Sequence, residues 1–104
     1  MDRIAHFEEH LSRRPDDRFA RYSLALELKK AGRHDDAVSA FAELLRRHPQ
    51  SGAGHYQLGL LWQERGDDER ARAAWEVGLE ALASANDPEA KRSIREIEGA
   101  LAAL

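Results

Sequence analysis

The chain has 104 residues, of which 42% are hydrophobic and 34% charged, and its formal net charge is −3. This length allows one domain, and the many charged residues suit exposed helices that carry ion pairs. The absence of cysteine excludes disulfides, thiolate catalysis and cysteine-based zinc sites. No stretch approaches the ~18 consecutive apolar residues that span a membrane, and the net charge provides no global attraction to nucleic acid.

The first half of the chain predicts three helices, over residues 2–14, 18–31 and about 35–48. A proline follows the first and the third of these segments and interrupts the helical pattern. Asp17 is a suitable N-cap for the second helix, and Gly32 is a suitable residue to end it.

The second half predicts three more helices, over about 52–65, 69–85 and 89–104. Before the last of them, the run Asn-Asp-Pro at 86–88 provides a capping side chain and then a proline at the first helical position. No segment alternates apolar and polar residues with a period of two, so the fold is expected to be all-α.

Equivalent residues recur every 34 positions, and such a fixed period is the mark of a helical repeat array. Each repeat in such an array is a helix pair that buries its apolar stripe by stacking on its neighbours. The recurring sets include Phe7, Phe41 and Trp75; Leu11, Leu45 and Leu79; Pro15 and Pro49; Tyr22 and Tyr56; Gly32 and Gly66; and Ala37 and Ala71.

Small residues at repeated positions predict close approach between helices. Ala25 and Gly59 lie on the first helix of each pair, and Ala37 and Ala71 on the second, where larger side chains would separate the backbones. The recurring aromatic residue is expected to project into the seam with the next pair. Gly78 stands in mid-helix, where glycine costs about 1 kcal/mol relative to alanine, so it should mark another close contact.

These motifs resemble the tetratricopeptide repeat (TPR) family. One whole repeat is carried by Tyr22-Ser23-Leu24-Ala25 with Gly32, Ala37, Phe41 and Pro49, and a second by Tyr56-Gln57-Leu58-Gly59 with Gly66, Ala71 and Trp75. The chain departs from the family at Arg21 and His55, where a large aromatic residue is common.

The resemblance implies a short right-handed α-solenoid of six helices in a single domain. Residues 2–15 match only the latter half of a repeat, through Phe7, Leu11 and Pro15. The full repeats would then occupy residues 18–51 and 52–85, and residues 88–104 would form a C-terminal capping helix.

The resemblance also implies a concave surface that is lined by the first helix of each pair and binds another polypeptide. The groove-facing positions would be Phe19, Tyr22, Leu26, Lys29 and Lys30 in one repeat, and Ala53, Tyr56, Leu60, Gln63 and Glu64 in the next. Family members that grip a terminal carboxylate have lysine, arginine and asparagine at such positions, whereas tyrosine and leucine occupy them here. We therefore expect a cytoplasmic, non-enzymatic module that binds a peptide or an amphipathic helix. Phe19, Tyr22 and Leu26, and likewise Tyr56, are alternatively explained as a cover for the neighbouring core.

A second hypothesis is a self-associating scaffold. The first and last helices would be caps that close the array, or their apolar residues would meet a second copy in a homodimer. The candidate residues for such contacts are Ile4, Phe7 and Leu11 at one end and Ile94, Ile97, Leu101 and Leu104 at the other.

Enzymatic and nucleic-acid readings have little support in the sequence. His6-Phe7-Glu8-Glu9-His10 matches a zinc-protease pattern, but no enclosing domain excludes water around it, and two solvated histidines explain it better. The pairs Arg13-Arg14 and Arg46-Arg47 lie at helix C-termini, where cations interact favourably with the helix dipole. We expect no catalytic residue, metal, cofactor, nucleic acid or membrane partner. Arginine (13 residues) far outnumbers lysine (3), which suits a GC-rich bacterial genome.

Overall fold

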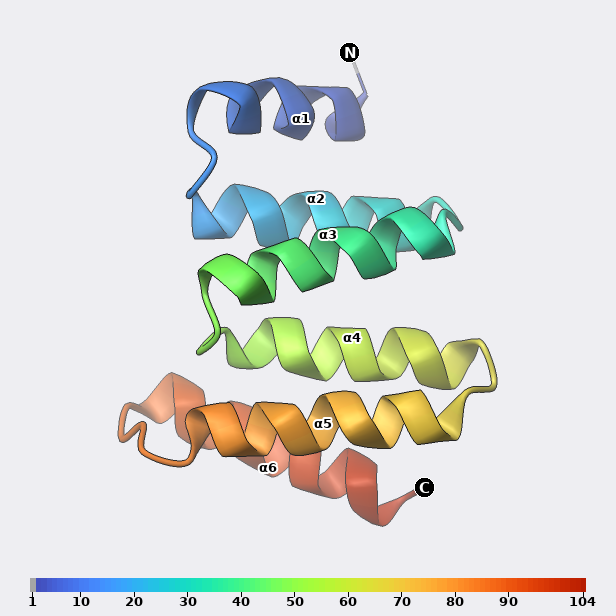
Figure 1. Cartoon of the computed structure of the whole chain (residues 1–104), viewed down its shortest axis with the longest axis vertical. Helices are drawn as coiled ribbons and strands as arrows, with labels where there is room; N and C mark the ends of the chain where they lie inside the picture. The colour runs from blue at the N-terminus through green and yellow to red at the C-terminus, as the bar shows by residue number, and fades with distance from the viewer. Residues whose placement is uncertain (1) are drawn as a thin grey trace. The chain divides into compact units, whose positions relative to one another are not determined.

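The structure is a computed structural model that describes residues 2–104. As predicted, these residues form six α-helices joined by short turns, and none of them forms a strand (Figure 1). The chain divides into two compact units, one ending at His48 and the other comprising Pro49–Leu104.

The first unit contains α1 (Arg3–Arg13), α2 (Arg18–Lys30) and α3 (His34–Arg47), and α2 packs against both of the others (Figure 1). The predicted N-cap of α2 is confirmed, because the carboxylate of Asp17 accepts a hydrogen bond from the backbone N–H of Ala20 at 3.0 Å. Helix α3 begins one residue earlier than predicted and has no side-chain cap. Its acidic residues instead lie in the first turn, where they complement the helix dipole.

The second unit contains α4 (Gly52–Glu64), α5 (Asp68–Leu82) and α6 (Pro88–Ala102). Helix α4 packs against α5, and α6 contacts both of them. Helix α5 ends at Leu82 rather than at residue 85, because the following residues form the turn that leads into α6. The predicted start of α6 is confirmed: Asp87 accepts from the N–H of Ala90 at 3.2 Å, and Pro88 is the first helical residue.

Glycines make the turn within each full repeat. Gly32 and Gly66 have φ angles of 74° and 79°, a backbone region that residues with a Cβ rarely adopt. The N–H of the residue after each glycine returns to the carbonyl five residues earlier, from Arg33 to Leu28 at 3.0 Å and from Asp67 to Trp62 at 2.9 Å. These bonds satisfy carbonyls at the ends of α2 and α4.

The two proline turns are held by a second repeated contact. The Nε of Arg21 donates to the carbonyl of Pro15 at 2.7 Å, and the Nε2 of His55 donates to the carbonyl of Pro49 at the same distance. Both donors occupy the position where the tetratricopeptide repeat family, which the sequence resembles, commonly has a large aromatic residue. Each side chain therefore fastens the start of its helix to the turn before it.

The core of the first unit lies where α2 and α3 approach closely. Ala25, Ala37 and Phe41 are fully buried, and the Tyr22 ring packs edge-on against Phe41 with ring centroids 6.4 Å apart. Phe41 thus packs against the other helix of its own pair.

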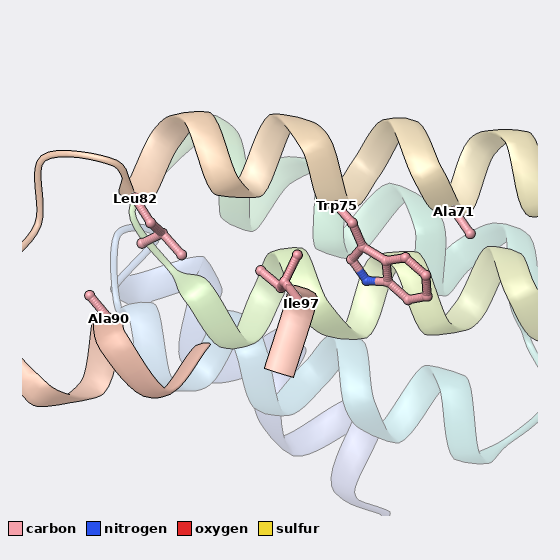
Figure 2. Close-up of a cluster of buried hydrophobic side chains, with 5 residues drawn as sticks. All are labelled: Ala71, Trp75, Leu82, Ala90 and Ile97. Carbon is pink, nitrogen blue, oxygen red and sulfur yellow. The ribbon is translucent and has the colours of Figure 1, made fainter. Parts of the chain in front are cut away.

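The core of the second unit is a cluster formed by Ala71, Trp75 and Leu82 of α5 with Ala90 and Ile97 of α6 (Figure 2). Trp75 crosses Gly59 of α4 so closely that a Cβ at that glycine would overlap the indole ring. The indole Nε1–H donates to the carbonyl of Tyr56 at 3.1 Å. The ring therefore fills the seam of its own pair, whereas the repeat pattern alone predicted the seam with the next pair.

The close contact predicted at Gly78 is also present. A Cβ on this glycine would lie 2.7 Å from the Cβ of His55 and 3.3 Å from Cδ1 of Ile97. Helices α4, α5 and α6 thus meet around a position that only glycine can occupy without displacement.

Candidate functional site

A surface hollow of about 400 Å³ lies between α1 and α2 in the first unit. Phe7, Phe19 and Leu26 supply its apolar lining, and Arg3, Glu27 and Lys30 are its charged residues. Phe19 has 74% of its surface exposed, which makes it, with Val77 on α5, one of two exposed large hydrophobic residues among residues 2–104.

Helical spacing explains why these side chains share one hollow. Phe19, Leu26 and Lys30 follow one another at steps of seven and four residues, which places them on one face of α2. Helix α1 packs against α2, and residues 3–7 bring Phe7 and Arg3 to the same place. The short turn after Pro15 fixes this pairing.

Among the residues that line the hollow, the exposed charges are cationic, whereas the exposed acids Asp2 and Glu8 lie in the adjoining hollow that shares Arg3 and Lys30. The side chains of Arg3 and Lys30 are 76% and 68% exposed, whereas that of Glu27 is 18% exposed. A single Glu27 oxygen serves both cations, at 3.0 Å from the guanidinium and 3.8 Å from the ammonium group. The acid is therefore largely enclosed, and its two partners keep most of their surface available to a ligand.

The structure brings together three of the five groove residues expected on α2. Phe19, Leu26 and Lys30 all line the hollow. Tyr22 is half-buried and directs its ring toward Phe41, and Lys29 is also half-buried.

The groove residues expected on α4 have more buried surroundings. Tyr56 and Leu60 are half-buried and pack against the cluster that contains Trp75 and Ile97. Gln63 is half-buried near the end of the helix, where its backbone carbonyl accepts from the N–H of Gly66 at 2.9 Å.

Sequence reasoning did not place Phe7 or Arg3 in this site. Phe7 shares the 34-residue period with Phe41 and Trp75, both fully buried, but Phe7 itself is only partly buried. The available signal was that residues 2–15 match half a repeat, so the helix that covers the corresponding aromatic residue in a full repeat is not among residues 2–48.

The histidines of the zinc-protease pattern have other contacts. The Nε2 of His10 lies 2.7 Å from a carboxylate oxygen of Asp17, and the His6 ring packs edge-on against Phe7. The pKa of Asp17 is lowered, first by the hydrogen bond from the N–H of Ala20 and then by the bond to His10. Within residues 2–104, no group of three His, Asp or Glu side chains is arranged to hold a metal ion.

The paired arginines are largely engaged with carboxylates. Arg46 and Arg47 both hydrogen-bond to Glu43 and lower its pKa to about 2. Arg47 also pairs with Asp16, and Arg13 pairs with Glu9 at 3.2 Å. Arg13, Arg46 and Arg47 therefore form ion pairs on the surface of the first unit.

None of the helices formed by residues 2–104 has both the length and the apolar character required to span a bilayer.

Helix pairs with a 34-residue period, glycine turns and a buried aromatic against a small residue define a helical repeat protein. The family model for the tetratricopeptide repeat matches residues 1–81, and the chain belongs to this family. It is 30% identical over 91 residues to the TPR repeat-containing protein PA0015 of Pseudomonas aeruginosa, an alignment that covers 88% of this chain and 87% of the relative. TPR repeats generally serve as protein–protein interaction modules and are generally non-enzymatic.

Proposed function

We propose that this chain is a non-enzymatic interaction module that binds a peptide or an amphipathic helix on the exposed face of its first repeat helices. The observation that carries the proposal is the hollow beside Phe19, where a large aromatic side chain with 74% exposure adjoins Phe7 and Leu26. An exposed aromatic residue in an apolar hollow with a charged border is typical of a binding surface.

The groove residues of α2 and α4 have different parts in this proposal. Phe19, Leu26 and Lys30 supply the ligand-contacting surface. Lys29 is half-buried and does not line the hollow. Tyr22 supports α2 from a half-buried position, and in the second unit Tyr56 and Leu60 are half-buried against that unit's own cluster. Gln63, half-buried near the end of α4, remains a separate candidate contact of the second unit.

The alternative, a self-associating scaffold, has less support. Ile94, Leu101 and Leu104 of the last helix region are half-buried against the second unit's own cluster. The exposed side chains of α6 are mostly charged and include Lys91, Arg92, Arg95, Glu96 and Glu98. This pattern favours a capping helix over an interface.

Affinity capture from a lysate of the source organism tests the proposal. Phe19→Glu and the double variant Phe19→Glu/Leu26→Glu should reduce capture of a specific partner about tenfold or more, because a charge replaces a central apolar contact. Val77→Glu is the matched control, since Val77 is also an exposed apolar residue (58%) but lies outside the hollow. Capture that persists unchanged in both variants, with unaltered melting temperatures, would remove this face from consideration.

A further inference from the structure

Phe7 in the first unit and Trp75 in the second occupy equivalent repeat positions, but the helices that surround them differ. Two repeat lengths, 2 × 34 = 68 residues, relate Phe7 to Trp75 and Leu26 to Ile94. By the same step α1 corresponds to α5, and α2 corresponds to α6. Helix α4 of the second unit has no counterpart among residues 2–48.

In the second unit, α4 covers the aromatic residue. Trp75 is fully buried, with its ring against Gly59 and its Nε1–H bonded to the carbonyl of Tyr56. Ile94 packs against the same cluster as Tyr56 and Leu60. In the first unit the corresponding residues, Phe7 and Leu26, line the open hollow.

From this comparison we infer that the hollow between α1 and α2 is a docking site for an acidic amphipathic helix supplied by a partner protein. The docked helix would cover Phe7 in the way that α4 covers Trp75, and it would lie against Leu26. The inference rests on the proposed function and adds to it the class of the partner and its position.

The requirement for acidic residues comes from Arg3. Ala37 and Ala71, which stand at this position in the full repeats, are fully buried and allow close helix approach. Arg3 prevents an equally close approach and leaves an exposed guanidinium at the edge of the hollow, with Lys30 beside it. Glu27 is the one acid among the lining residues, so a carboxylate on the docked helix finds two cations and little repulsion.

A second copy of this chain fits the hollow poorly. A symmetric contact would place Arg3 and Lys30 near their own copies, which is electrostatically unfavourable. The other exposed large hydrophobic residue within residues 2–104 is Val77, and it stands alone on α5 rather than in an apolar stripe.

Two synthetic helices of about 16 residues test the inference, since this length is sufficient for a designed helix to form on binding. Both carry the same apolar face of leucine and tyrosine, and they differ in having glutamate or lysine on the polar face. Fluorescence anisotropy of each labelled peptide with the full chain measures the dissociation constants at low salt. The glutamate peptide should bind about tenfold more tightly than the lysine peptide, from two charge pairs.

Charge reversal provides the decisive variant. Arg3→Glu/Lys30→Glu should reverse the preference in favour of the lysine peptide. Because the variant leaves Glu27 beside two acidic side chains in place of two cations, its melting temperature is measured alongside. Phe19→Glu should abolish binding of the glutamate peptide, whereas Val77→Glu should leave it unchanged. Equal affinity for both peptides, or no binding of either, would overturn the inference.

Analytical sedimentation of the wild-type chain tests whether a second copy of the chain occupies the hollow. A dimer that dissociates on Phe19→Glu would show that a second copy occupies the hollow, and it would overturn the acidic-helix assignment. If lysate capture depends on Phe19 but neither peptide binds, the partner class is wrong and the interaction module stands. If capture is independent of Phe19, the proposed function itself fails.

Discussion

Arg21 and His55 show how a polar residue can take a position where the family often has an aromatic one. Each donates a hydrogen bond to a proline carbonyl in the turn that precedes its helix. The burial differs, since His55 is 3% exposed and Arg21 is only half-buried. The sequence reveals the departure but not this contact, because the turn must fold before the carbonyl and the donor meet.

Burial of His55 links stability to pH. Desolvation lowers the pKa of the imidazole below its ordinary value of 6.5, although the hydrogen bond to Pro49 opposes the shift. The unfolded chain therefore binds the proton more readily than the folded chain. The contribution of neutral His55 to stability is complete above pH 6.5 and is lost as the pH falls toward the lowered pKa.

The prediction is that urea unfolding of the wild type shows a free energy of unfolding that falls as the pH drops below 6.5. His55→Gln keeps an N–H donor for Pro49 without a titrating group, so its free energy should fall less over the same range. An NMR titration of His55 should give a pKa below 6.5. Identical pH profiles for the two proteins would contradict this account of the buried imidazole.

At the scale of helices, the repeat pattern predicted all six elements and their order. The pattern predicted helix ends and helix contacts less accurately, because these depend on tertiary structure. The third helix begins at His34, one residue before the predicted start and without a side-chain cap, and the fifth ends at Leu82 because the chain must turn toward Asp87. The contact of Trp75 with α4 of its own pair was not predicted, although the ring also belongs to the cluster with α6. Periodicity shows that a residue faces inward but not which neighbouring helix it contacts.

The packing of α4 on α5 depends on Gly59. In an exposed helix, alanine would be favoured over glycine by about 1 kcal/mol. At Gly59 the new Cβ would overlap the Trp75 ring, which is held by the bond to the Tyr56 carbonyl, so Gly59→Ala should lower the free energy of unfolding by about 1–3 kcal/mol.

Gly99 is the matched control for this substitution. It lies in α6, and a Cβ there would meet no atom within 4 Å. Gly99→Ala should therefore leave stability unchanged or raise it by up to about 1 kcal/mol. Thermal or urea unfolding of both variants measures the difference, and an equal response at the two glycines would contradict the close helix contact.

For the molecule as a whole, the family resemblance led us to expect Phe19, Leu26 and Lys30 on one ligand-binding surface. They lie together in the hollow, and the binding of a ligand there stays a proposal. Phe7 and Arg3 could not be assigned to the site from the register alone, because the matching positions 41 and 37 are buried core residues. Only the arrangement of α1 against α2 shows that no helix of residues 2–48 covers Phe7.

If an acidic helix docks in the α1–α2 hollow, an NMR titration should locate it there. Isotope-labelled full chain would be titrated with the unlabelled glutamate peptide. We expect the largest changes in backbone chemical shift at the residues that line the hollow, namely Arg3, His6, Phe7, Phe19, Ser23, Leu26 and Lys30. Shift changes concentrated on α5 and α6, or none at saturating peptide, would contradict it.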